Sequence, residues 1–206
     1  MSLPPLIHVV DDDEPLRTAL LRLLSAAGYE ARGYGSAGAF LMSPPPDRPG
    51  CVLLDVRMPG PTGLDLQAAL RERRIALPVI FLTGHADVSA SVRAMKTGAV
   101  DFLTKPVERE TLFDALRRAL ELDARERAAH AEAIRLRAGF ATLTPREREV
   151  FELVVAGRLN KQIAGQLGIA ERTVKADRAQ VLAKLGVGSA AELGALAERL
   201  RQLPID

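Results

Sequence analysis

The sequence of 206 residues predicts an α/β domain with five parallel strands, followed by a small all-helical domain. Over residues 1–122, short apolar runs alternate with longer stretches whose leucines recur at helical spacing, which indicates successive strand–helix–strand units. After residue 139 only the helical spacing persists, and glycines interrupt it. With 48% hydrophobic and 26% charged residues the chain has ordinary globular composition, which argues against disorder.

Four short apolar runs that end at turn or acidic residues mark expected strands, and a fifth strand with a weaker pattern is expected at Tyr29–Tyr34. The four runs are Leu6–Val10, Cys51–Leu54, Pro78–Leu82 and Val100–Leu103. Helices between parallel strands cover both faces of the sheet, so we expect a doubly wound, flavodoxin-like domain over residues 1–122.

A single long helix is expected over residues 108–138, because this stretch contains no strong helix breaker. Its first half is amphipathic, and its second half is rich in alanine and charge. We therefore interpret residues 123–138 as a semi-rigid helical linker to a second domain over residues 139–206.

Four helices are expected in the second domain. Thr144, Pro145 and Glu147 form a capping box with a proline start. The expected helices are 145–157, Asn160–Leu167, Ala170–Leu185 and Ser189–Leu203. The second and third are joined by a tight turn containing Gly168, which is the shape of a helix-turn-helix.

The charge is distributed unevenly, although the net charge is only +2. Residues 158–184 carry six basic side chains against two acidic ones, which favours a nucleic-acid partner, although a solvated face would have the same charge. No apolar run reaches the ~18 residues of a membrane span, and the first residues lack the basic start of a signal peptide. The single cysteine, Cys51, excludes an internal disulfide. These features predict a soluble cytoplasmic protein.

Polar side chains follow four of the expected strands. Asp11 and Asp12 come directly after the first strand, Asp55 after the third, Thr83 after the fourth and Lys105 after the fifth. Ligands of open parallel sheets bind outside the carboxyl ends of the strands, near the point where the strand order reverses. We therefore expect these five side chains to converge on one site.

This combination of residues suits phosphoryl transfer. Carboxylates that share a pocket repel one another, and Mg²⁺ relieves that repulsion because it prefers oxygen ligands. A carboxylate can also act as the nucleophile toward a phosphoryl group, forming an aspartyl phosphate. A lysine, a hydroxyl and a metal ion then stabilise the transferred group, with no need for the Walker-A loop that the chain lacks.

Four segments over about residues 4–122 resemble the receiver domain of two-component response regulators. They are VVDDDEP, LLDVRMPGPTGLDL, FLTGHADV and AMKTGAVDFLTKP, and they occur in the family's order. The resemblance implies that Asp55 accepts a phosphoryl group from a histidine kinase. It also implies that Asp11, Asp12 and Asp55 hold Mg²⁺, with the carbonyl of Arg57 contributing.

The same resemblance implies three further roles. Thr83 is the switch hydroxyl, Lys105 contacts the phosphoryl oxygens, and Phe102 is the aromatic side chain that changes rotamer. A cis peptide bond is implied between Lys105 and Pro106. By contrast, we interpret Asp13 as an acid at a helix start and expect no direct chemical role for His85.

The segment LTPREREVFELVVAGRLNKQIAGQLGIAERTVKADRAQVLAKLGV resembles the LuxR-type helix-turn-helix, over about residues 140–200. A receiver, a linker helix and a LuxR-type module together are similar to response regulators of the NarL/FixJ class. The helical spacing directs four residues of the third helix outward, toward the major groove of DNA. They are Thr173, Lys175, Ala176 and Ala179. Asn160 and Lys161 are expected at phosphates, and Arg178 at the DNA backbone.

Two positions depart from the LuxR-type pattern. Asp177 stands where the family usually has histidine, and Ala170 stands where it often has a serine or threonine that caps the helix. We expect Asp177 on the turn that approaches the DNA backbone. A carboxylate there either repels phosphate or accepts a hydrogen bond from a cytosine amino group.

The sequence thus predicts a phosphorylation-dependent regulator of transcription that is not an enzyme. Phosphorylation of Asp55 would recruit Thr83, turn Phe102 inward and alter the surface near Val92 and Met95. The altered surface would either join two copies on DNA half-sites or release the DNA-binding domain. One alternative is an adaptor protein with a weak or degenerate DNA-binding module. A less favoured alternative is a metal-dependent phosphohydrolase that forms an aspartyl phosphate.

Overall fold

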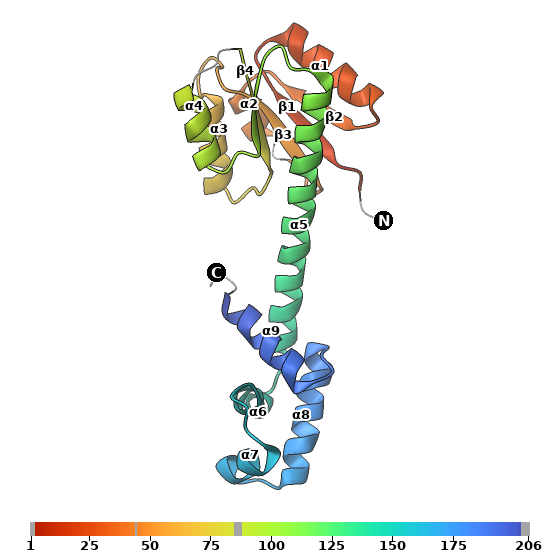
Figure 1. Ribbon diagram of the computed structural model, residues 1–206, viewed down its shortest axis with the longest axis vertical. Coiled ribbons are helices and arrows are strands. Elements are labelled where there is room, and N and C mark those ends of the chain that lie inside the picture. Colours follow the sequence, from red (N-terminus) through yellow and green to blue (C-terminus); the bar gives the residue numbers. More distant parts are fainter. Residues whose placement is uncertain (1–2, 44, 85–87, 203–206) are drawn as a thin grey trace. The chain divides into compact units, whose positions relative to one another are not determined.

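The computed structural model, which describes residues 3–43, 45–84 and 88–202, contains the expected five-stranded parallel sheet (Figure 1). Its strands are β1 (Leu6–Val10), β2 (Glu30–Tyr34), β3 (Gly50–Asp55), β4 (Val79–Thr83) and β5 (Asp101–Thr104). They lie in the order β2-β1-β3-β4-β5, so the direction of strand progression reverses between β1 and β3. The doubly wound, flavodoxin-like fold class is confirmed.

Helices cover both faces of this sheet, as the alternation of buried residues requires. They are α1 (Glu14–Ala26), α2 (Ala37–Met42), α3 (Gly63–Glu72), α4 (Val88–Lys96) and the first part of α5 (Arg109–Ala141). Ile7 and Val9 of β1 point to the core under α1 and α5. Val10 and Val52 point to the opposite core, under α2, α3 and α4.

The helix α5 is held against the first residues of β3 by two of its side chains, Asp123 and Arg127, which we call the α5 anchor. The buried Asp123 carboxylate accepts a hydrogen bond from the Gly50 N–H at 3.1 Å. Arg127 donates from Nε to both Asp123 oxygens at 3.0 Å, from Nη1 to Asp47 Oδ1 at 2.7 Å and from Nη2 to the Arg48 carbonyl at 2.7 Å. The anchor joins this part of α5 to the end of the sheet opposite Asp55.

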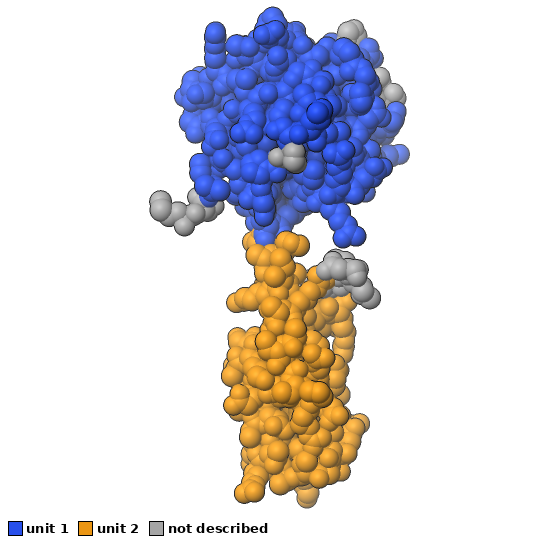
Figure 2. Space-filling view, turned by 180° about the vertical axis from the view of Figure 1, so that it is seen from behind, with its two compact units in different colours: residues 1–127 blue, residues 128–206 orange. Residues whose placement is uncertain are grey.

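The chain divides into two compact units, residues 1–127 and 128–206 (Figure 2). The second unit contains α6 (Pro145–Val155), α7 (Asn160–Leu167), α8 (Glu171–Leu185) and α9 (Ala190–Gln202). The predicted capping box of Thr144 and Glu147 starts α6. Leu203, the expected end of the last helix, lies outside the described residues. None of the described helices combines the length and hydropathy that crossing a membrane requires.

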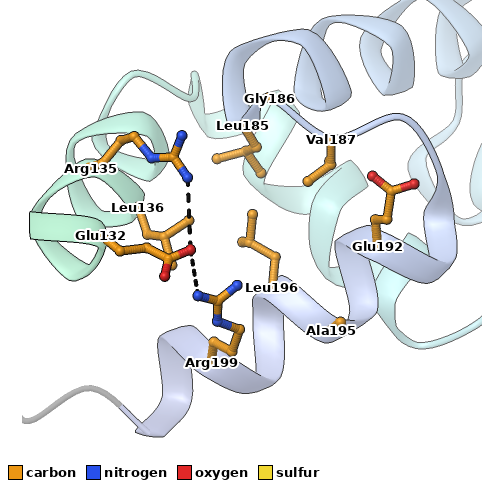
Figure 3. A pocket seen from close by; sticks show the side chains of 10 residues that line it. All are labelled: Glu132, Arg135, Leu136, Leu185, Gly186, Val187, Glu192, Ala195, Leu196 and Arg199. Carbon is orange, nitrogen blue, oxygen red and sulfur yellow. Dashed lines mark ion pairs between the residues drawn. The ribbon is translucent and has the colours of Figure 1, made fainter. Parts of the chain in front are cut away.

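The last turns of α5 belong to the core of the second unit. Leu136 is only 7% exposed in that core, and the Phe140 ring packs edge-on against Phe151 with centroids 5.2 Å apart. Glu132 of α5 forms an ion pair with Nη2 of Arg199 at 2.5 Å and lines a pocket of about 230 Å³. Figure 3 shows Glu132 between Arg135 and Arg199. Between the α5 anchor and these turns, residues 128–131 are exposed.

Candidate functional site

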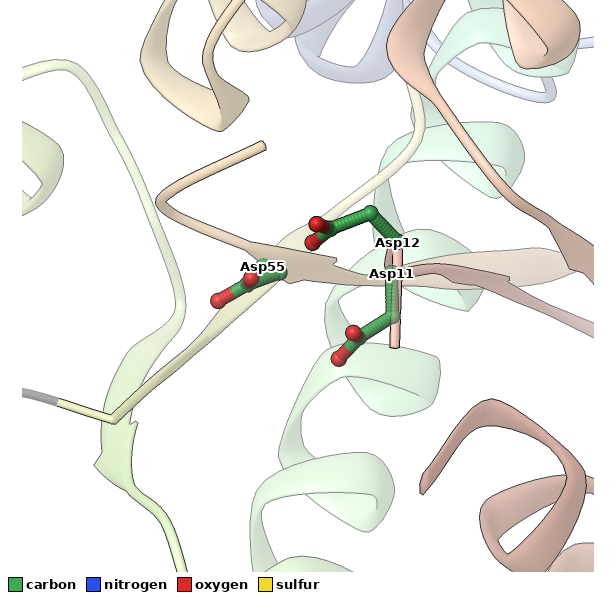
Figure 4. A group of neighbouring side chains, drawn as sticks. All are labelled: Asp11, Asp12 and Asp55. Atoms are coloured by element: carbon green, nitrogen blue, oxygen red, sulfur yellow. The ribbon is translucent and has the colours of Figure 1, made fainter. Parts of the chain in front are cut away.

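The carboxyl ends of β1 and β3 bring Asp11, Asp12 and Asp55 together (Figure 4). One carboxylate oxygen from each residue lies within 4.8 Å of the other two. Asp11 and Asp55 are buried, whereas Asp12 is exposed. A Cβ atom at Gly63 would lie 2.1 Å from the Asp55 carbonyl oxygen, so glycine is required for α3 to begin beside the acidic site.

Lys105 completes this cluster from the end of β5. Its Nζ atom lies 2.6 Å from Asp11 Oδ2 and 3.3 Å from Asp55 Oδ1. The Lys105–Pro106 peptide bond is cis, as the family resemblance implied. Four of the five side chains that were expected to converge, namely Asp11, Asp12, Asp55 and Lys105, therefore lie in direct proximity.

The electrostatics of the cluster reflect burial and mutual charge. Burial, the largest effect, raises the pKa of the Asp55 carboxyl above its usual value; Lys105 opposes this rise, and Asp11 and Asp12 add to it. Burial disfavours the charged form of Lys105, but its hydrogen bonds and ion pairs with Asp11 and Asp55 outweigh this and raise its pKa. Lys105 thus remains a cation that partly neutralises the three carboxylates.

The donor set fits a magnesium ion. Three carboxylates supply hard oxygen ligands from two neighbouring strand ends, and Asp12, being exposed, leaves room for the water molecules that Mg²⁺ retains. Arg57, whose carbonyl was expected to contribute, follows Asp55 by two residues and has an exposed side chain.

The two expected switch residues lie on adjacent strands. Thr83 is buried at the end of β4, where it pairs in register with Thr104 of β5. Phe102 of β5 is half-buried, and its ring centroid lies 6.1 Å from that of Phe81. His85, for which no role was expected, falls outside the described residues.

Two residues near the site have structural roles, and that of Asp13 was expected. Asp13 caps α1, with its carboxylate accepting a hydrogen bond from the Leu16 N–H at 3.0 Å. His8 is buried, and its ring packs against those of Tyr34 and Phe40 with centroids 5.8 Å and 5.3 Å away. Burial, followed by the charges of nearby arginines, lowers the pKa of His8 to about 4, so the imidazole is neutral near pH 7.

In the second unit, α7 and α8 form the predicted helix-turn-helix pair. The four residues expected at the major groove are all exposed on α8, and Val174 and Val181 of the same helix are buried. The four are Thr173, Lys175, Ala176 and Ala179. Lys161 is exposed on α7. No side-chain hydrogen bond caps α8 at Ala170, which agrees with the poor cap expected there.

Two other predicted DNA-contact residues contact each other. Nη1 of Arg178 donates a hydrogen bond to Oδ1 of Asn160 at 3.1 Å, and both side chains are half-buried. This bond links the first turn of α7 to the middle of α8. Sequence reasoning assigned both residues to phosphate contacts and missed the bond, because residues 18 apart carry no local signal of contact.

Asp177 is placed differently from our expectation. Instead of standing out toward the DNA backbone, it is half-buried, and its Oδ2 atom is enclosed with no hydrogen-bond partner among the described residues. The reason is helical spacing: Asp177 lies three residues after Val174 and four before Val181, both of which are in the core. Sequence reasoning judged Asp177 by its distance from Lys175 and not by its spacing from Val174 and Val181.

Asp177→Ala should therefore stabilise the second unit by about 1 kcal/mol, because an enclosed acceptor without a donor costs about 1–3 kcal/mol and alanine favours helix. The loss of a negative charge should also tighten binding to random DNA. Denaturant unfolding and fluorescence anisotropy measure the two effects. Glu152→Ala, at an exposed acid of α6, is the control for net charge. Equal effects of both substitutions would contradict this account of Asp177.

Each of the two units matches a different model of a known protein family. A family model described as "Response regulator receiver domain" matches residues 7–117, and one described as "Bacterial regulatory proteins, luxR family" matches residues 141–197. Nodulation protein W of Bradyrhizobium diazoefficiens is 44% identical over 199 residues, which cover 97% of this chain and 88% of that protein. Transcriptional regulatory protein FixJ of Rhizobium meliloti is 43% identical over 179 residues, or 87% of this chain and 88% of that protein.

Two solved structures also resemble this chain over nearly its whole length. The response regulator StyR is 44% identical and matches with a TM-score of 0.87 over 96% of this chain and 100% of its own. Full-length FixJ from B. japonicum is 40% identical and matches with a TM-score of 0.59 over 97% of this chain and 98% of its own.

Proposed function

Since the chain belongs to the two-component response regulators of transcription that join a receiver domain to a LuxR-family DNA-binding domain, we propose that phosphorylation of Asp55 controls the binding of promoter DNA by α8. A histidine kinase would supply the phosphoryl group, in the cytoplasm where the DNA target lies. The observation that carries this proposal is the cluster of Asp11, Asp12, Asp55 and Lys105 at the point where the strand order reverses.

Each residue of the cluster has a distinct task in this proposal. An Asp55 carboxylate oxygen forms a bond to phosphorus while the bond from phosphorus to the kinase histidine nitrogen breaks. Asp11, Asp12 and Asp55, with the Arg57 carbonyl, would hold Mg²⁺, which neutralises charge on the transferring group. Lys105, 3.3 Å from Asp55, is placed to stabilise the phosphoryl oxygens. The Thr83 hydroxyl then binds the phosphorylated group.

The response to phosphorylation would spread over α4 and β5. Movement of Thr83 toward the phosphoryl group leaves space that the half-buried Phe102 ring can enter from β5. The neighbouring surface of α4 already exposes apolar side chains: Val92 is 46% exposed and Met95 49%, and Lys96 lies beside them. This surface is suited to join two copies of the chain, which would place two α8 helices on two DNA half-sites.

Addition of Mg²⁺ and beryllofluoride, a mimic of the phosphorylated state, should therefore shift the chain from monomer to dimer in sedimentation. Met95→Asp should block the shift, because dimerisation would bury a charge. Met42→Asp, at a methionine of α2 that is 88% exposed, should leave the shift intact. An identical monomer fraction with and without the mimic would refute activation by dimerisation.

Selection of binding sites from random DNA, with and without beryllofluoride, tests the DNA-binding function itself. A recurring sequence that is enriched more strongly with the mimic is the expected result. Lys175→Ala should weaken binding and lower the salt dependence by about one unit of slope, if Lys175 contacts a phosphate. Recovery of no sequence would favour an adaptor protein, and turnover of small phosphoesters would favour a phosphohydrolase.

A further inference from the structure

Arg17 of α1 reaches back to the loop that carries the acidic residues. Its Nη1 atom donates a hydrogen bond to the backbone carbonyl of Asp11 at 2.6 Å, and the side chain is half-buried. No step of the proposed phosphoryl transfer uses this arginine, and neither the strand ends nor the family resemblance pointed to it.

The carbonyl that Arg17 holds belongs to the peptide that joins Asp11 to Asp12. The other polar groups of Asp11 are also held. Its N–H donates to the Tyr34 carbonyl at 3.1 Å, and its two carboxylate oxygens accept from the Asp13 N–H at 3.0 Å and from Lys105 at 2.6 Å. Fixing the carbonyl as well sets the plane of the Asp11–Asp12 peptide, and hence the direction in which the exposed Asp12 leaves the loop.

Two glycines give the Arg17 side chain the space that it occupies. A Cβ atom at Gly33 of β2 would lie 3.2 Å from Arg17 Cδ and 2.9 Å from Leu21 Cδ1, so both side chains would have to shift. A Cβ atom at Gly35 would lie 3.6 Å from Arg17 Nη1, which is ordinary contact. Neither glycine has a positive φ, so alanine tests only the space at these positions.

We propose that Arg17 is a positioning residue for the magnesium site, acting through the Asp11–Asp12 peptide. The inference rests on the proposed function, since it assumes that Asp11, Asp12 and Asp55 hold Mg²⁺. Groups that orient metal ligands without touching the metal typically contribute 10–100-fold to metal affinity. Arg17→Ala should accordingly weaken Mg²⁺ binding by about tenfold.

The direction of this effect separates positioning from simple electrostatics. A nearby positive charge repels Mg²⁺, so removal of the Arg17 charge alone would tighten Mg²⁺ binding. Loss of the hydrogen bond that fixes the peptide would weaken binding. The sign of the change in affinity therefore decides between the two roles.

Isothermal titration of the full-length chain with Mg²⁺ alone provides the test. Weaker binding in Arg17→Ala, with the unfolding temperature of the metal-free chain little changed, supports the proposal. Unchanged or tighter binding overturns it. If Arg17→Ala does not fold, Gly33→Ala decides: weaker Mg²⁺ binding than in the matched control Gly35→Ala supports the proposal, and equal binding in the two variants overturns it.

Asp12→Ala keeps failure of the proposed function distinct from failure of this inference. Because Asp12 is a proposed ligand, its removal should weaken Mg²⁺ binding whatever Arg17 does. Unchanged affinity in Asp12→Ala would reject the magnesium site itself, and with it the role of Arg17. Weaker binding in Asp12→Ala together with unchanged binding in Arg17→Ala would reject only the positioning role.

Discussion

The chain carrying Asp55→Asn should take up no phosphoryl group from acetyl phosphate in the presence of Mg²⁺. The unaltered chain should gain one phosphoryl group, which base treatment removes. The reason is chemical: the amide that replaces the carboxylate has nearly the same shape but is a poor nucleophile. Intact-protein mass spectrometry measures the uptake. Labelling of Asp55→Asn in similar yield would show that another residue is the acceptor.

The stability of the same variant serves as its folding control. The pKa of Asp55 in the folded chain is raised, chiefly by burial, so ionisation of this carboxyl destabilises the metal-free fold. The stability that Asp55 contributes is present below the pKa of about 3.9 in the unfolded chain, and it is lost as the pH rises through the higher folded-state value. Asn does not ionise. Asp55→Asn should thus unfold at a higher temperature than the unaltered metal-free chain at pH 7, so its loss of labelling would not reflect misfolding.

Leu136→Ala should lower the free energy of unfolding of the second unit by about 3 kcal/mol, because it removes a buried side chain and leaves a cavity. Leu136 belongs to α5 but lies in the same core as Val150, Val174 and Val181. The first unit should keep its stability, since among the described residues its hydrophobic core takes none from α5 beyond Leu120. Hydrogen exchange read by mass spectrometry reports on each unit separately within the full chain.

Ile134→Ala is the matched control for this prediction. Ile134 lies two residues from Leu136 on the same helix, is also a large aliphatic residue, and is 52% exposed. We expect its replacement to change stability by no more than about 0.5 kcal/mol. Equal destabilisation by the two substitutions, or faster exchange in the first unit with Leu136→Ala, would mean that the last turns of α5 are not part of the second core.

The sheet and its acidic site were accessible from sequence because each signal was local. An apolar run such as Cys51–Leu54 marks a strand, and Asp55 immediately after it marks that strand's carboxyl end. Parallel strands then bring such ends to one edge of the sheet without any knowledge of packing. For the same reason, the capping box of Thr144 and Glu147 located the start of α6.

Interactions between distant segments were not accessible in this way. The contact of Asp123 with Gly50 spans 73 residues, and nothing in the charged stretch around Asp123 distinguishes it from a solvated helix face. Arg17 was missed because its partner is a backbone carbonyl, which every residue possesses. Asp177, by contrast, was misplaced although its signal was local, because its spacing of three and four residues from the buried Val174 and Val181 was not weighed.

The exposed helical turn of α5 at residues 128–131 also has a consequence for the exchange of domains between related regulators. The α5 anchor stays entirely on the N-terminal side of this turn, and Leu136 and Phe140 stay entirely on the C-terminal side. A chimaera joined within the turn would inherit both sets of buried contacts intact. One joined at residue 123 or at residue 139 would divide one of these sets of contacts between the two parent proteins. Recombination within residues 128–131 would thus join a different receiver domain to this DNA-binding domain without disrupting either hydrophobic core.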